Sequence, residues 1–192
     1  DDPVYVSGGD CPLLRQCRTA DASRAKYGAG QRFTLGLLAR AAVLNTQQLE
    51  DDTATMLKID PITPNYRIAG TQATPVMGQT LNKVGRTTGW TQGKVVATCE
   101  NVDVSDSNIT QLCQSLVGAY VAGGDSGSPV FGLNTDGTIF LGGILWGSST
   151  DLVTNEVQFI FSPYASIERE MGTLTVTDPT LTVTKGRKKQ KP

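Results

Sequence analysis

Hydrophobic and polar positions alternate in short runs along the second half of the chain, and turn residues separate these runs. An alternation with a period of two is typical of β-strands that bury one face. Asp136-Gly137 lies between two such runs and is a strong signal for a hairpin turn. Six antiparallel strands at this spacing are expected to close into a small barrel. The pattern predicts these strands at residues 80–86, 94–99, 109–117, 128–133, 138–146 and 156–161.

The period changes after the last predicted strand. Ser162 and Pro163 are expected to serve as the N-cap and the first-turn residue of a helix. Apolar residues then recur at helical spacing as far as Gly172, which can end the helix. We therefore expect a short C-terminal helix that packs on the barrel.

The pattern is weaker before the barrel. Residues 32–43 and 66–69 are candidate strands, and a polar loop separates them. These are too few strands for a second closed barrel. Residues 1–75 are therefore assigned to a partial N-terminal barrel and linker, and residues 76–172 to the barrel with its helix.

The remaining residues, 173–192, form a tail. The sequence TLTVT occurs there twice, at 173–177 and 180–184, and a basic stretch follows. Alternating Thr and apolar residues fit an edge strand or the start of another domain, whereas the basic end has no apolar residues to bury. We expect this tail to be disordered.

Composition agrees with an all-β protein. The 192 residues are 39% hydrophobic, enough for a core, and they include 21 glycines but only 6% aromatic residues. The net charge is −1, and five of the 17 basic residues lie in the tail. We therefore expect no nucleic-acid partner. No apolar run approaches the roughly 18 residues of a membrane span, so we expect no membrane association either.

The four cysteines are Cys11, Cys17, Cys99 and Cys113. Four cysteines allow three pairings, and we favour the local one, Cys11–Cys17 with Cys99–Cys113. A metal site would need C-x-x-C spacing or histidine ligands, and the sequence has neither. Free buried thiols are the alternative. Disulfides predict a secreted protein.

The strongest motif is the string GGDSGSPVF at residues 123–131. It describes a glycine-rich turn that presents the Ser126 hydroxyl and leads into a strand. Glycines permit backbone conformations that aim N–H groups outward, and such donors can hold the oxyanion of an acyl-transfer transition state. The G-x-S-x-G elbow of α/β-hydrolases is excluded, because it would need glycine at Ser128. A plain Ser/Gly-rich hairpin loop is the alternative.

This nine-residue string resembles the nucleophile segment of chymotrypsin-like serine proteases, especially bacterial ones. The resemblance implies that Ser126 is the nucleophile and that the amides of Gly124 and Ser126 form the oxyanion hole. Asp125 resembles the buried aspartate that holds this loop in its active shape. Residues 83–89 (KVGRTTG) match the bacterial pattern of an internal arginine, so Arg86 is expected to pair with Asp125; the alternative is a surface arginine.

A serine hydroxyl needs a base, which in this family is a histidine oriented by an aspartate. Residues 17–27 (CRTADASRAKY) resemble the family's aspartate segment and make Asp21 the candidate orienter, although an ordinary turn aspartate is the alternative. The sequence contains no histidine. In relatives the histidine precedes the aspartate, so we expect an N-terminal segment that carries it and expect these residues alone to be inactive. A Ser–Lys dyad that uses Lys83 or Lys94 as the base is an alternative, but neither lysine lies in a motif that indicates one.

Residues 143–148 (GILWGS) resemble the strand that pairs with the substrate backbone. This implies that Leu145, Trp146 and Gly147 contact substrate, although a buried core strand is the alternative. Tyr120 stands where trypsin-like specificity would place aspartate, so cleavage after Arg or Lys is not indicated. Glutamate-specific relatives use a pocket histidine, which this sequence lacks. The expected preference is therefore for substrates with apolar or small side chains at the cleavage site.

The resemblance implies a chymotrypsin-like double β-barrel with a complete C-terminal barrel, a partial N-terminal one and a short C-terminal helix. It also implies a serine-type endopeptidase that hydrolyses protein or peptide substrates through an acyl-enzyme, without a cofactor or metal. One alternative is a catalytically inactive protease homologue that acts as a peptide- or protein-binding module. Another is a structural β-domain whose loop matches by chance.

Overall fold

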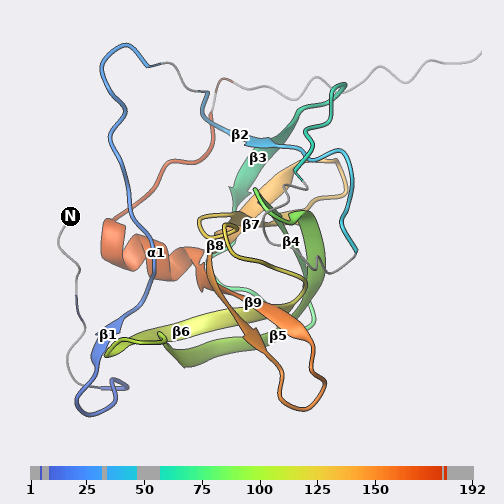
Figure 1. Ribbon diagram of the computed structural model, residues 1–192. Coiled ribbons are helices and arrows are strands. Elements are labelled where there is room, and N and C mark those ends of the chain that lie inside the picture. The colour runs from blue at the N-terminus through green and yellow to red at the C-terminus, as the bar shows by residue number, and fades with distance from the viewer. Residues whose placement is uncertain (1–4, 6–8, 32–33, 47–56, 179, 181–192) are drawn as a thin grey trace, which may run out of the picture.

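The structure is a computed structural model of the 192-residue chain. It describes residues 5, 9–31, 34–46, 57–178 and 180, which are drawn as a coloured ribbon in Figure 1.

Six antiparallel strands close into a barrel at the centre of the molecule (Figure 1). The ring runs β4-β5-β6-β9-β8-β7 and returns to β4, so each strand is hydrogen-bonded to two neighbours. Closure removes the free edges that an open sheet would expose. The strands are β4 (Thr80–Gly85), β5 (Gly89–Asp103), β6 (Ile109–Gly118), β7 (Pro129–Leu133), β8 (Ile139–Thr150) and β9 (Val157–Pro163).

These six strands confirm the predicted barrel. The turn between β7 and β8 is the predicted hairpin, since Gly137 has φ of +83° and donates to the carbonyl of Asn134 at 3.1 Å. Strand β5 is longer than predicted and pairs with β6 over most of its length. Apolar side chains from all six strands fill the barrel: Leu81, Val95, Val117, Val130, Leu145, Phe159 and Phe161.

One short helix, α1 (Tyr164–Met171), follows β9 and ends at Gly172, as predicted. The N-cap prediction is wrong, because the N-cap is Pro163 and makes no side-chain cap bond. Strand β9 continues through Pro163, so Ser162 is still a buried strand residue. Its hydroxyl points into the protein and donates to Gln114 Oε1 at 2.9 Å.

The N-terminal region contributes three strands to the described part of the chain. Strand β1 (Gln16–Arg18) runs parallel to β6, whereas β2 (Leu37–Ala39) pairs antiparallel with β3 (Asn65–Thr71), which runs parallel to β8. Strand β3 covers the whole candidate strand 66–69, whereas β2 covers only residues 37–39 of the candidate strand 32–43. A second barrel stays a prediction. A second apolar cluster packs where β3 meets the barrel: Ala41, Tyr66, Ile68, Val84, Phe131 and Ile139.

Both predicted disulfides are present, Cys11–Cys17 and Cys99–Cys113. The predicted disorder does not extend to the first residues of the tail. Leu174 accepts a hydrogen bond from the Tyr164 hydroxyl at 3.1 Å, and Val176 packs against the second apolar cluster. Apart from Thr180, the tail beyond Asp178 lies outside the described residues.

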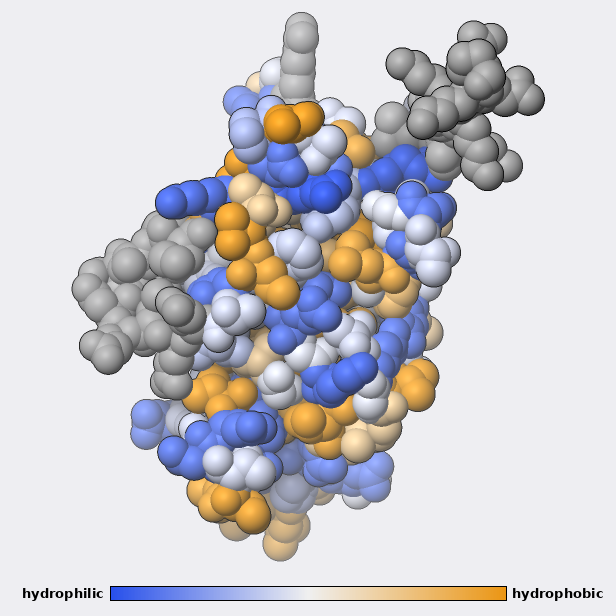
Figure 2. Space-filling model, turned by 90° about the vertical axis from the view of Figure 1, so that its right-hand side faces the viewer, coloured by the Kyte–Doolittle hydropathy of each residue, from blue (hydrophilic) through white to orange (hydrophobic). Residues whose placement is uncertain are grey.

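No helix in the described ranges is long and apolar enough to cross a membrane. On the face shown in Figure 2, the apolar side chains of described residues lie in small groups separated by polar ones. That part of the surface therefore presents no extended apolar patch. The all-β fold class, with its closed barrel and short C-terminal helix, is confirmed.

Candidate active site

Ser126 lies in a tight turn just before β7. The amide of Gly127 donates to the carbonyl of Leu145 at 2.8 Å, and the amide of Leu145 donates to the carbonyl of Ser128 at 2.9 Å. The amide of Ser128 also donates back to the carbonyl of Asp125 at 3.0 Å. Because these bonds fix the residues on both sides, the exposed Ser126 has a defined place at the surface.

Glycine is required within this turn at Gly124. Its φ of +91° lies in the left-handed region that side chains disfavour. A Cβ atom there would also lie 2.5 Å from Arg86 Nη2 and 2.7 Å from Thr87 Oγ1. The glycine-rich sequence therefore serves the backbone conformation that the motif predicted.

The buried Asp125 carboxylate anchors the turn to the protein interior. Asp125 is 0% exposed and accepts hydrogen bonds from Lys83 Nζ at 2.8 Å and from the Thr88 hydroxyl at 2.6 Å. The amides of Thr87, Thr88 and Ala122 donate to the same carboxylate at 3.0, 3.1 and 3.2 Å. A buried charge with this many donors is well satisfied, so the carboxylate ties the turn to the end of β4.

Lys83 and Asp125 form an ion pair that is 0% exposed at both side chains. Burial alone would raise the pKa of Asp125. The hydrogen bonds from Lys83 and Thr88, together with the positive charge of Lys83, outweigh this effect and hold that pKa below its ordinary value. Burial lowers the pKa of Lys83, and the attraction of Asp125 offsets only part of this effect. Either charge would be costly without the other.

The prediction that Arg86 pairs with Asp125 is wrong, because Lys83 takes that place. Lys83 lies within β4 and points into the protein, where it also donates to Thr88 Oγ1 and to the Gly89 carbonyl. Arg86 lies in the turn after β4 and is exposed, with its guanidinium group beside Gly124. Sequence reasoning found the right segment but chose the wrong cation within it.

Asp21 reaches the same pocket as Ser126. The pocket encloses about 430 Å³ and opens to solvent. In the described part of the chain, the Asp21 carboxylate makes no hydrogen bond or ion pair, and its amide donates to Ser162 Oγ at 2.9 Å. The pocket is lined by Asp21, Ala22, Ser23, Ser126, Gly127, Ile144, Leu145 and Trp146.

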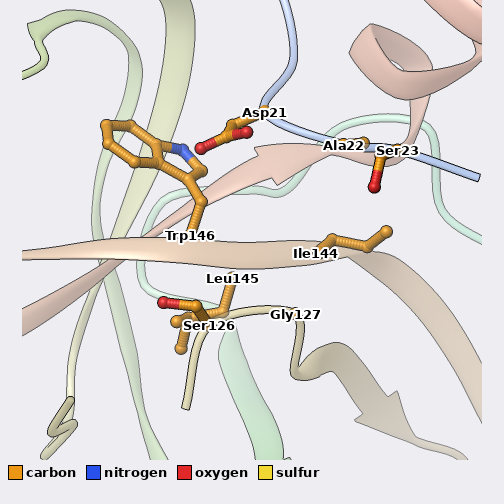
Figure 3. A pocket seen from close by; sticks show the side chains of 8 residues that line it. All are labelled: Asp21, Ala22, Ser23, Ser126, Gly127, Ile144, Leu145 and Trp146. Carbon is orange, nitrogen blue, oxygen red and sulfur yellow. The ribbon is translucent and has the colours of Figure 1, made fainter. Parts of the chain in front are cut away.

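Strand β8 separates the two candidate catalytic side chains in Figure 3. The Asp21 carboxyl group lies beside the Trp146 indole on one side of the strand, whereas Ser126 and Leu145 lie on the other. Successive side chains of a strand point to opposite faces, which explains the opposite directions of Leu145 and Trp146. Among the described residues, no hydrogen bond joins Asp21 to Ser126, and both face the shared pocket.

The predicted substrate-contacting residues divide into two groups. Leu145 and Trp146 line the pocket, whereas Tyr120 and Gly147 are not part of its lining. The Trp146 indole N–H donates to Oε1 of the buried Gln114 at 2.9 Å. No sequence signal had identified Gln114, because a single polar residue within a strand pattern carries no local mark of its partners.

The amides expected to form an oxyanion hole belong to Gly124 and Ser126. Within the described ranges, neither amide donates a hydrogen bond to a protein acceptor, whereas the neighbouring amides of Asp125, Gly127 and Ser128 all do. The two amides on either side of the buried Asp125 therefore have no protein acceptor among the described residues.

The chain is similar to solved structures of bacterial chymotrypsin-like serine proteases. Thermobifida fusca protease A is 24% identical, with 59% of this chain and 56% of that chain covered and a TM-score of 0.48. Cellulomonas bogoriensis chymotrypsin is 23% identical, with 62% of this chain and 61% of that chain covered and a TM-score of 0.49. A glutamic acid specific serine protease, described as using a histidine triad in substrate binding, is 28% identical. The match covers 58% of this chain and 55% of that chain, with a TM-score of 0.46.

The chain thus spans between 55% and 61% of the length of these three proteins. No protein-family model matches the sequence, and a comparison with curated proteins finds no match.

Proposed function

We propose that the protein is a secreted serine endopeptidase and that these residues supply its nucleophile. One observation carries the proposal: an exposed serine, fixed by a buried aspartate, shares a pocket with a carboxylate that has no partner among the described residues. A hydroxyl held in this way becomes a nucleophile when a base takes its proton. Asp21, which lines the same pocket, would orient such a base.

The base itself is a histidine in the natural protein that lies outside these 192 residues, which contain none. Its imidazole would enter the pocket that Asp21 and Ser126 both line. Ser126 Oγ then attacks the carbonyl carbon of the scissile peptide bond while the imidazole takes its proton. The amides of Gly124 and Ser126 hold the oxyanion, the imidazole returns the proton to the leaving amine, and water hydrolyses the acyl-enzyme by the same steps.

Neither lysine near the motif is suited to replace that base. Lys83 is committed to Asp125, Thr88 and the Gly89 carbonyl deep inside the barrel. Lys94 donates to the Thr80 hydroxyl at 2.7 Å on the exposed side of its strand. A Ser–Lys dyad would need one of these amines at the Ser126 hydroxyl.

We further propose that protein or peptide substrates lie along β8 at Leu145, Trp146 and Gly147. Tyr120 provides no carboxylate for a basic side chain, so small or apolar side chains are the expected preference. Two disulfides support a secreted location, because such bonds persist in oxidising compartments. No cofactor takes part in this mechanism.

Three serine and aspartate variants of the natural protein test the proposal on a protein substrate. Ser126→Ala should lower kcat about 10⁶-fold, and Asp21→Asn about 10⁴-fold, because nucleophile and orienter act as one unit. Ser23→Ala is the matched control, since Ser23 lines the same pocket and has no assigned role. Full activity in Ser126→Ala would contradict the proposal.

The second candidate function is a peptide-binding module without catalytic activity, because the sequence contains no histidine to act as the base. The same assay tests it. A protease-shaped domain without its base would bind a peptide at β8 without cutting it. Such a binding module predicts that the natural protein binds peptides, hydrolyses none of them and is indifferent to Ser126→Ala.

A further inference from the structure

Gln114 is a fully buried amide at the junction of four segments. Its side chain is 0% exposed. Its Nε2 donates to the carbonyls of Thr19 at 2.9 Å and Leu112 at 2.7 Å. Its Oε1 accepts from the Ser162 hydroxyl and from the Trp146 indole N–H, both at 2.9 Å. Two donors and two acceptor sites are the whole capacity of this amide, and all are used.

Ser162 extends the network to Asp21. Its hydroxyl is also 0% exposed, and it accepts the Asp21 amide at 2.9 Å while donating to Gln114. A continuous chain of hydrogen bonds therefore runs from Trp146 through Gln114 and Ser162 to the main chain of Asp21. Buried networks that are completely satisfied are stiff and specify one arrangement.

The position of Asp21 depends on this chain of bonds. Just before it, the amides of Thr19 and Ala20 donate to Glu170 Oε1 at 2.6 and 2.9 Å. Just after it, residues 22–28 are mostly exposed and belong to no strand. Asp21 is held through its amide by the buried Ser162 hydroxyl, and its carboxylate has no partner of its own in the described chain to correct its direction.

We infer that Gln114 and Ser162 are positioning residues, which hold the main chain of Asp21 in register with Trp146 on β8. The inference rests on the proposed function and deepens it. A group that orients a catalytic base must stay within about 0.5 Å of its productive position. Because both residues act through Asp21 and touch neither substrate nor the reacting atoms, they are not catalytic residues.

The test compares two buried serines in the natural protein. Ser162→Ala removes the hydroxyl that receives the Asp21 amide. Ser115→Ala is the matched control, because Ser115 lies next to Gln114 and its buried hydroxyl has no partner among the described residues. We expect Ser162→Ala to lower kcat about tenfold with KM unchanged, and Ser115→Ala to leave both unchanged.

Two further readouts separate positioning from a purely structural role. The apparent pKa of the base in the kcat–pH profile should fall in Ser162→Ala, because a misplaced carboxylate stabilises the protonated imidazole less well. In an Asp21→Asn background, Ser162→Ala should cause no additional loss. An additive loss in that background, or an equal loss in Ser115→Ala, would overturn the inference.

Amide hydrogen exchange tests the anchoring without any need for catalysis. Ser162→Ala should speed exchange at Asp21 while the amides of β5 and β6 keep their protection. Unchanged exchange at Asp21 overturns the inference even in an active enzyme. A parent protein that is inactive but shows the faster exchange refutes the proposed function and supports the anchoring. If Ser162→Ala does not fold, Ser162→Cys, which keeps a weak donor and acceptor at this position, should show the same changes to a lesser degree.

Discussion

The two halves of the candidate site are supported in different ways. Ser126 stands on a barrel in which every strand is paired on both sides, and a buried ion pair fixes its turn. Asp21 follows a three-residue strand, β1. Its amide donates to the Ser162 hydroxyl, and the amide of Ala20 just before it donates to Glu170. The comparison indicates that the candidate nucleophile shares the global stability of the barrel, whereas the candidate orienter depends on a few local side-chain contacts.

The largest expected effect comes from removing one charge of the buried pair. Lys83→Met should lower the free energy of unfolding by about 3–5 kcal/mol, because it leaves the Asp125 charge buried without a cation. Urea denaturation of the purified protein measures this loss. Arg86→Met is the control and should change the stability by less than about 0.5 kcal/mol, since Arg86 is exposed. Equal losses in both variants would remove the special role of the pair.

Acid should weaken the barrel through Asp125, whose pKa is held low by Lys83 and Thr88 against the effect of burial. A carboxylate of this kind contributes stability at pH values above its unfolded pKa, about 3.9. The contribution is lost as the pH falls through the folded pKa, because the unfolded chain binds the proton first.

We therefore expect the urea midpoint to fall as the pH drops below about 5. The fall should be shallower in Asp125→Asn, which has no carboxylate there to titrate. Asp60, Asp136 and Asp151 also have lowered pKa values, but they are present in both proteins and cancel in the comparison. An equally steep fall in both proteins would contradict this role for Asp125.

The smallest effect on global stability is expected at the anchor of the Asp21 segment. Glu170→Gln keeps the shape of the side chain but weakens its ion pair with Arg18 and its bonds to the Thr19 and Ala20 amides. We expect a loss of about 1 kcal/mol or less, together with faster amide exchange at Thr19 and Ala20. Exchange that accelerates equally in β5 and β6 would show that the segment and barrel open as one unit.

The barrel was predictable from the sequence because its signals are local. Alternating apolar positions and the Asp136-Gly137 turn mark strands wherever they occur, and the structure has all six. The end of β9 shows the limit of such signals. Ser162-Pro163 has the composition of a helix start, but the strand continues through it because Gln114 and Asp21 supply partners for the Ser162 hydroxyl.

The site was predictable in its motif and not in its supports. Ser126 and Asp21 carry resemblance to known segments, and both line one pocket. The partner of Asp125 depends on which cation of residues 83–89 points inward, a choice made by strand pairing and not by the motif. Gln114 was missed for the same reason, since three of its four partners, Thr19, Trp146 and Ser162, come from segments far from it in the sequence.

Fluorophosphonate labelling of the natural protein, with the adduct located by peptide mass spectrometry, tests the central claim most directly. Such a reagent reacts with a serine whose hydroxyl is activated by an adjacent base. The account predicts one adduct, on Ser126, that disappears in Ser126→Ala and forms far more slowly in Asp21→Asn. A well-folded natural protein that acquires no adduct on Ser126 would contradict the claim and leave a binding module with the shape of a protease.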